Sequence, residues 1–120
     1  MGINKDLGLP FGEGMEKVAF CFDIDGTLID GDEKHVNTIK LLVAMGEQRW
    51  KNVRIVVWSG GGKQYAETIV RRLALDTIPN LMVIGKLEYT RLREDGYCIV
   101  AVDDVQDTRL GDVNLIVRNK

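Results

Sequence analysis

The fold follows from the segment VAFCFDIDGT at residues 18–27, in which a short apolar run ends in two aspartates, a glycine and a threonine. An apolar run of this length is typical of a strand that is buried on both faces, as the strands of parallel sheets are. Asp23 and Asp25 then leave the strand, and Gly26 permits the tight backbone path of a turn. The segment therefore predicts a buried strand that delivers two carboxylates to one edge of a sheet.

Apolar runs and amphipathic stretches alternate along the rest of the chain. The expected strands lie at residues 18–22, 53–58, 81–84, 98–102 and 113–117. The expected helices lie at residues 33–47 and 63–75, with a shorter one at 87–93. Because strand and helix alternate, we expect a Rossmann-like α/β fold with a parallel sheet of about five strands and helices on both faces.

Composition indicates one globular domain of 120 residues, with 45% hydrophobic and 28% charged residues. The glycine-rich residues 1–17 suggest a flexible leader before a single domain at 18–120. The chain has no apolar run near the roughly 20 residues of a membrane span and no signal peptide, and Cys21 and Cys98 are isolated. We expect a cytoplasmic protein without membrane contact. The net charge of -2 leaves nucleic acid possible only as a substrate.

Polar side chains follow four consecutive predicted strands. Asp23 follows the first strand, Ser59 the second and Lys86 the third, while Asp103 and Asp104 follow the fourth. Ligands of open α/β sheets bind at the carboxyl ends of the strands, and these ends lie at one edge of a parallel sheet. The sequence therefore predicts that these groups converge on one site.

The motifs that these residues form resemble those of the haloacid dehalogenase superfamily, over about residues 18–117. In order, the four motifs are Asp23-x-Asp25-Gly26-Thr27, Ser59, Lys86 and Asp103-Asp104. The resemblance implies a magnesium-dependent phosphohydrolase, a phosphomonoesterase in which Asp23 forms an aspartyl phosphate. It also implies that the backbone carbonyl of Asp25 binds Mg²⁺.

The chemistry of the first motif can be argued from its side chains. A carboxylate is a weak nucleophile, but a divalent cation can align Asp23 with a phosphoryl group that would otherwise repel it. Asp25 could protonate the leaving alkoxide and then take a proton from the water that hydrolyses the intermediate. We expect Gly26 to permit the turn and Thr27 to brace it through a side-chain hydrogen bond.

The second and third motifs are expected to bind phosphate. Ser59 and Gly60 open a glycine-rich loop before a helix, where a hydroxyl and free N–H groups could hold phosphate oxygens. The alternative is a serine that caps this helix. Lys86 would offset charge on Asp23 and the phosphoryl oxygens, with Lys63 as its rival for this role.

The fourth motif is expected to bind magnesium. Asp103, Asp104 and Asp107 offer three carboxylates, which suit a hard cation that prefers oxygen ligands. Asp103 is the expected ligand in either spacing of the motif, together with Asp104 or Asp107. Solvated loop charges are the alternative.

The intervals between the motifs leave no room for an inserted cap domain, so we expect an open site. Its substrate would be a small phosphorylated metabolite or an accessible phosphate on a macromolecule, and the chain could be a homo-oligomer. Two alternatives remain: a receiver-like phosphoacceptor module, and a catalytically silent binding protein of the same fold. The receiver is disfavoured because its phosphorylated aspartate would follow the third strand, where this chain has Gly85 and Lys86.

Overall fold

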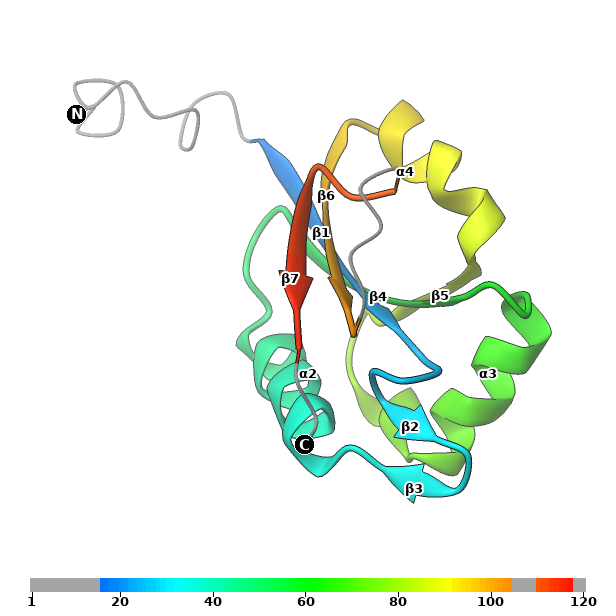
Figure 1. The fold of residues 1–120 in the computed structure, drawn as a ribbon. Coiled ribbons are helices and arrows are strands. Elements are labelled where there is room, and N and C mark those ends of the chain that lie inside the picture. The colour runs from blue at the N-terminus through cyan, green and yellow to red at the C-terminus, as the bar shows by residue number, and fades with distance from the viewer. Residues whose placement is uncertain (1–15, 105–109, 118–120) are drawn as a thin grey trace.

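A five-stranded parallel sheet forms the centre of the molecule in a computed structural model that describes residues 16–104 and 110–117 (Figure 1). Its order is β5-β4-β1-β6-β7, and each neighbouring pair is parallel. The strands are β1 Lys17–Asp23, β4 Val53–Ser59, β5 Met82–Gly85, β6 Tyr97–Asp103 and β7 Val113–Ile116. The predicted fold class is confirmed, and the strands lie within about one residue of their predicted bounds.

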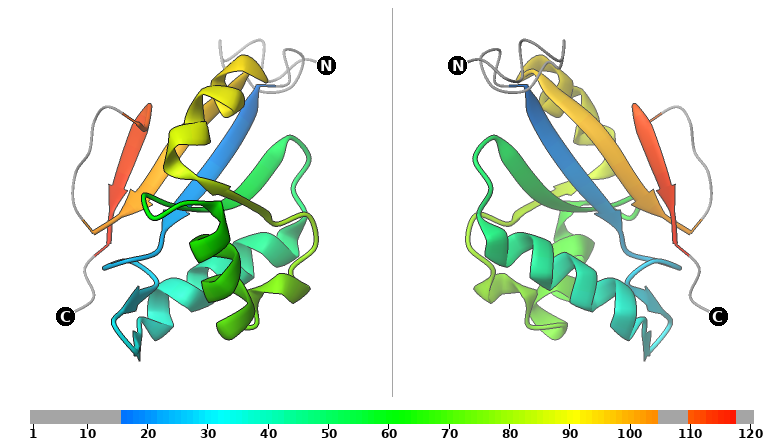
Figure 2. Two further views of the ribbon diagram at one scale, coloured as in Figure 1. Left: turned by 90° about the vertical axis from the view of Figure 1, so that its right-hand side faces the viewer. Right: turned by 90° about the vertical axis from the view of Figure 1, so that its left-hand side faces the viewer.

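Helices cover both faces of the sheet (Figure 2). Helices α2 (Val36–Gln48) and α3 (Lys63–Arg72) lie on one face, and α4 (Tyr89–Glu94) lies on the other. The central strand β1 contributes alternate residues to the two layers, since Phe22 packs toward α2 and α3 while Cys21 packs toward α4. This two-sided burial explains the continuous apolar run that precedes Asp23.

The first predicted helix begins later than its sequence pattern indicates. A small antiparallel hairpin occupies its first residues, formed by β2 (Ile29–Asp30) and β3 (Glu33–Lys34). Gly31 lies in the turn with a positive φ of 62°, a conformation that glycine adopts without steric cost. The hairpin is the structure that fills the interval between β1 and α2.

The other two predicted helices differ from expectation at their ends. The helix predicted at 63–75 stops at Arg72, because Ala74 takes a left-handed conformation before the short 3₁₀ helix η1 (Leu75–Thr77). The helix predicted at 87–93 is preceded by a second 3₁₀ turn, η2 (Lys86–Glu88), and then continues as α4. None of the described helices is long and apolar enough to span a membrane. Cys21 and Cys98 form no disulfide.

Candidate functional site

The candidate site lies where the order of the strands reverses. From β1 the chain continues to β4 and β5 on one side, and later to β6 and β7 on the other. The boundary between β1 and β6 is therefore the topological switch point, where ligands of such sheets bind. Asp23 and Asp103 are the last residues of these two strands. The fold thus brings together two carboxylates that are far apart in the sequence.

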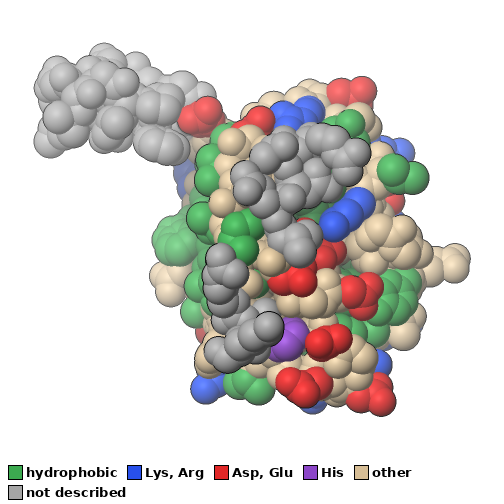
Figure 3. All heavy atoms as spheres, viewed as in Figure 1, with side chains coloured by type: hydrophobic (Ala, Val, Ile, Leu, Met, Phe, Trp, Pro, Cys, Tyr) green, Lys and Arg blue, Asp and Glu red, His purple; other side chains and the backbone are tan. Residues whose placement is uncertain are grey.

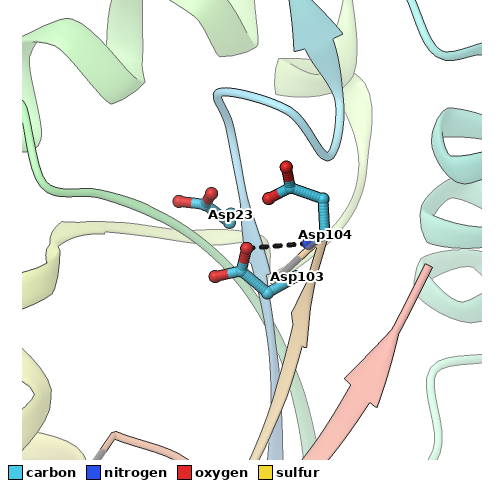
Figure 4. Close-up of side chains that lie close together, drawn as sticks. All are labelled: Asp23, Asp103 and Asp104. Atoms are coloured by element: carbon cyan, nitrogen blue, oxygen red, sulfur yellow. Dashed lines mark hydrogen bonds between the residues drawn. The ribbon is translucent and has the colours of Figure 1, made fainter. Parts of the chain in front are cut away.

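Three carboxylates gather at this point (Figure 4). One oxygen each of Asp23, Asp103 and Asp104 lies within 4.8 Å of the others. The backbone N–H of Asp104 donates a hydrogen bond of 2.7 Å to Oδ1 of Asp103 and so fixes the orientation of that carboxyl. The side chains of Asp23 and Asp103 are only 12% and 7% exposed. Buried like charges at this distance require a cation or a shared proton.

Lys86 supplies one positive charge to the cluster. Its Nζ lies 3.0 Å from Oδ1 of Asp23 and 3.5 Å from Oδ2 of Asp103. Burial alone would lower the pKa of Lys86, but its attraction to Asp23 and then to Asp103 outweighs burial, so its pKa is raised. Lys63, the rival in the sequence, is exposed at the start of α3. The structure therefore brings Lys86 to the carboxylates.

Burial makes the carboxylates of the cluster harder to ionise. Burial raises the pKa of Asp23 to about 6, while Lys86 opposes this rise and Asp103 adds to it. The hydrogen bond with the Asp103 side chain raises the pKa of Asp104, and partial burial raises it further. One ammonium group does not compensate three carboxylates. The fully ionised cluster keeps two net negative charges.

These residues fit a divalent cation. One carboxylate oxygen from each of the three residues lies within 4.8 Å of the others, a spacing at which a single cation can contact all three. A charge of two matches the excess negative charge of the cluster, and carboxylate oxygens are the ligands that Mg²⁺ prefers. The carboxylate of Asp25 lies outside this cluster. Its backbone carbonyl stays a predicted ligand, and Asp107 lies outside the described residues.

Two features of the structure require a glycine at position 26: its positive φ and the close approach of the Asp104 side chain. Its φ is +86°, and a methyl group added there would lie 2.6 Å from Cγ of Asp104. The turn after β1 and the end of β6 therefore meet with no space for a side chain at this position. The sequence predicted the tight turn, but the close approach of Asp104 follows only from the structure.

Thr27 does not brace the turn as the sequence suggested. Its hydroxyl is buried without a hydrogen-bond partner in the described part of the chain. The turn is instead closed by main-chain N–H groups of Thr27, Leu28 and Ile29, which all donate to the carbonyl of Ile24, at 3.2, 2.9 and 3.1 Å. These backbone bonds hold the turn, so that prediction is wrong.

Ser59 and the glycines after it form a loop at the end of β4. Oγ of Ser59 accepts a hydrogen bond of 2.9 Å from the N–H of Gly61, so its own O–H remains able to donate to an anion. The residue that caps α3 is Gly62, so Ser59 is not a helix cap. A side chain at Gly60 would meet nothing within 4 Å, which leaves its backbone accessible.

Asp25 differs from its neighbour Asp23 because it is exposed. Its Oδ1 accepts a hydrogen bond of 2.8 Å from the hydroxyl of Tyr65. Sequence reasoning missed Tyr65, although its position in the first turn of α3, just after the Ser59 loop, places it at the same edge of the sheet. An aromatic residue on a helix is usually read as core, and the ring of Tyr65 does also pack against the core.

Several acidic side chains are exposed on the surface around the site (Figure 3). The exposed carboxylates come from the loop after β1 and from the hairpin: Asp25, Asp30, Asp32 and Glu33. A phosphate ester would be repelled by this face unless a cation lay between it and the carboxylates.

The chain was compared with models of known protein families, with curated proteins and with solved structures, and none of the three comparisons found a significant match. The strand order and the parallel sheet define the class of protein as a Rossmann-like α/β protein.

Proposed function

We propose that this chain is a magnesium-dependent phosphohydrolase of the haloacid dehalogenase type that hydrolyses phosphate monoesters through an aspartyl phosphate on Asp23. The contact that supports this proposal most is that of Lys86, whose Nζ approaches both Asp23 and Asp103 at the switch point. A lysine at this place can hold a nucleophilic carboxylate and also offset charge on a phosphoryl group. A purely structural ion pair would not need the third carboxylate, Asp104.

The first half of the reaction transfers the phosphoryl group to the protein. Ser59 and the N–H of Gly60 bind phosphoryl oxygens, and Lys86 holds Oδ1 of Asp23 so that Oδ2 can attack phosphorus. The bond between phosphorus and the ester oxygen breaks, and Asp25 gives its proton to that oxygen. A Mg²⁺ ion bound by Asp23, Asp103 and Asp104 would supply charge neutralisation between the carboxylates and the phosphoryl oxygens.

The second half regenerates the carboxylate. Asp25, now ionised, takes a proton from a water molecule whose oxygen attacks phosphorus. The bond between phosphorus and Asp23 breaks, and inorganic phosphate leaves. The exposure of Asp25 suits this role, because its carboxyl must meet both the departing alcohol and the entering water.

The test compares Asp23→Asn with wild type in a turnover assay with an aryl phosphate and Mg²⁺. We expect a loss of at least about a thousandfold, because the amide keeps the shape of the side chain but is not a nucleophile. Asp76→Asn, which changes an exposed acid in η1, is the matched control and should keep full activity.

The same assay separates the alternatives. A phosphoacceptor module would accept a durable phosphoryl group with little turnover, and a silent binding protein would neither accept nor release phosphate. Activity of Asp23→Asn within tenfold of wild type would contradict the proposal outright.

A further inference from the structure

Tyr65 contacts the side chain that the proposed mechanism uses to move protons. Its hydroxyl donates a hydrogen bond of 2.8 Å to Oδ1 of Asp25, which lies 40 residues earlier in the chain. Within residues 16–104 and 110–117, no other side chain hydrogen bonds this carboxyl group. An exposed carboxylate that would otherwise rotate in solvent is therefore held by one phenol.

The ring of Tyr65 is itself held in place. It packs against the apolar cluster between the sheet and α3. A methyl group added at Gly61 would lie 3.2 Å from ring carbon Cδ2, so the glycine loop lies directly on the ring. Because the N–H of Gly61 also donates to Ser59, one side chain links the expected phosphate loop with Asp25.

We propose that Tyr65 is a positioning residue that orients the Asp25 carboxyl group for both proton transfers, an inference that rests on the proposed phosphohydrolase function. A phenol can donate to a carboxylate and equally to the carbonyl oxygen of a neutral carboxylic acid. With Oδ1 held by Tyr65, Oδ2 carries the proton that passes to the leaving oxygen and later receives the proton of water. The hydrogen bond is therefore kept in both protonation states of Asp25.

The energetic reason lies in orientation. A carboxyl group released from the phenol samples several rotamers, and few of these place Oδ2 within hydrogen-bond reach of the leaving oxygen. The contact also changes the acidity of the phenol. The hydrogen bond to Asp25 raises the pKa of Tyr65, and burial of the side chain raises it further.

The decisive experiment is Tyr65→Phe, which keeps the packed ring and removes only the hydroxyl. kcat/KM is measured for phosphate monoesters whose leaving groups range from nitrophenol to simple alcohols. We expect about a tenfold loss for alkyl phosphates and less than about a twofold loss for nitrophenyl phosphate, because nitrophenolate leaves without a proton. A merely structural role would lower kcat/KM equally for all esters.

A double variant tests whether Tyr65 acts through Asp25. Asp25→Asn combined with Tyr65→Phe should lose no more kcat/KM than Asp25→Asn alone, since there is no acid left to position. Tyr97→Phe is the matched control. Tyr97 is half-buried at the start of β6, the opposite end of that strand from Asp103, and its variant should show the wild-type dependence on leaving group.

A measurement without substrate tests the same contact. Ultraviolet titration of the phenols in Asp25→Asn should show that one of the tyrosine pKa values falls relative to wild type, because the charged acceptor is gone. An unchanged titration would overturn the inference, as would an equal loss for all esters or an unchanged leaving-group dependence in Tyr65→Phe while wild type turns over. Absence of turnover by wild type would overturn the proposed function and this inference together.

Discussion

The degree of burial of a side chain distinguishes residues of the site that have the same chemical type. Asp23 and Asp25 are two positions apart, yet one is buried against Lys86 and the other is exposed to solvent. The buried carboxylate is held in place, as the proposed nucleophile must be, and the exposed one is accessible to water, as the proposed acid and base must be. Neighbouring residues of one motif thus receive different physical roles from their surroundings.

The raised pKa of Asp23 predicts how the stability of the metal-free protein depends on pH. Burial raises the pKa of Asp23 to about 6 in the folded chain, so the folded state binds this proton more tightly than the unfolded state. The contribution of Asp23 to stability is therefore fully present below about pH 4 and is lost as pH rises through about 6. Asp23→Asn lacks this loss.

Chemical denaturation in EDTA at pH 4 and at pH 7.5 checks the expectation. Relative to wild type, Asp23→Asn should gain at most about 3 kcal/mol of unfolding free energy between the two values. A difference between the two proteins that does not change with pH would mean that Asp23 is not the buried acid described here.

Much of the site was predictable at this scale because strand ends are visible in the sequence. Asp23, Ser59, Lys86 and Asp103 each end or directly follow an apolar run, and the structure brings them to one edge of the sheet. Tyr65 was not predictable, because its contact with Asp25 joins two segments whose approach depends on how α3 packs. A hydroxyl on a helix carries no signal of the carboxylate that it will meet.

Among the elements, the tight turn after β1 was predicted from the sequence, but the structure that surrounds this turn was not. The small hairpin was missed, because its two-residue strands are too short to show an alternating pattern. The approach of Asp104 to Gly26 was also invisible, since it depends on the parallel pairing of β1 with β6. Periodicity predicts elements, whereas contacts between loops come from the packing of whole strands.

Gly26→Ala is predicted to damage both the turn and the cluster of carboxylates. At a φ of +86° an alanine costs about 1–2 kcal/mol, and its methyl group would also displace the Asp104 carboxylate. We expect a lower melting temperature and a weaker stabilisation by Mg²⁺, both measured by thermal scans.

Gly96→Ala is the matched control for this substitution. Gly96 has a φ of +87°, and a methyl group there would meet nothing within 4 Å. The Gly96→Ala variant should therefore lose only the stability that a positive φ costs an alanine, and Mg²⁺ should stabilise it as much as wild type. If both variants keep that response, then Asp104 does not contribute to the metal site.

For the molecule as a whole, the arrangement of charge matters more than the total. The net charge is only -2, but the carboxyl ends of β1 and β6 and the hairpin beside them form an acidic face (Figure 3). Such a face raises the local concentration of cations and repels phosphate esters until a cation is bound. The stability of the whole fold is therefore expected to depend on whether a cation occupies the proposed metal site.

Magnesium is expected to stabilise the entire chain, because it relieves repulsion among Asp23, Asp103 and Asp104 in the folded state alone. At a concentration of roughly ten times its dissociation constant, the ion adds about 1.4 kcal/mol to the free energy of unfolding, which raises the melting temperature of a domain of this size by roughly 5 °C.

The variant Asp103→Asn keeps an acceptor for the N–H of Asp104 but removes one charge. Without metal this variant should melt no lower than wild type, and with metal it should lose most of the shift. Asp76→Asn, at the far end of α3 from the Ser59 loop, should keep the full shift. Thermal scans with EDTA and with Mg²⁺ measure all three proteins, and an equal shift in wild type and Asp103→Asn would place the metal at other carboxylates.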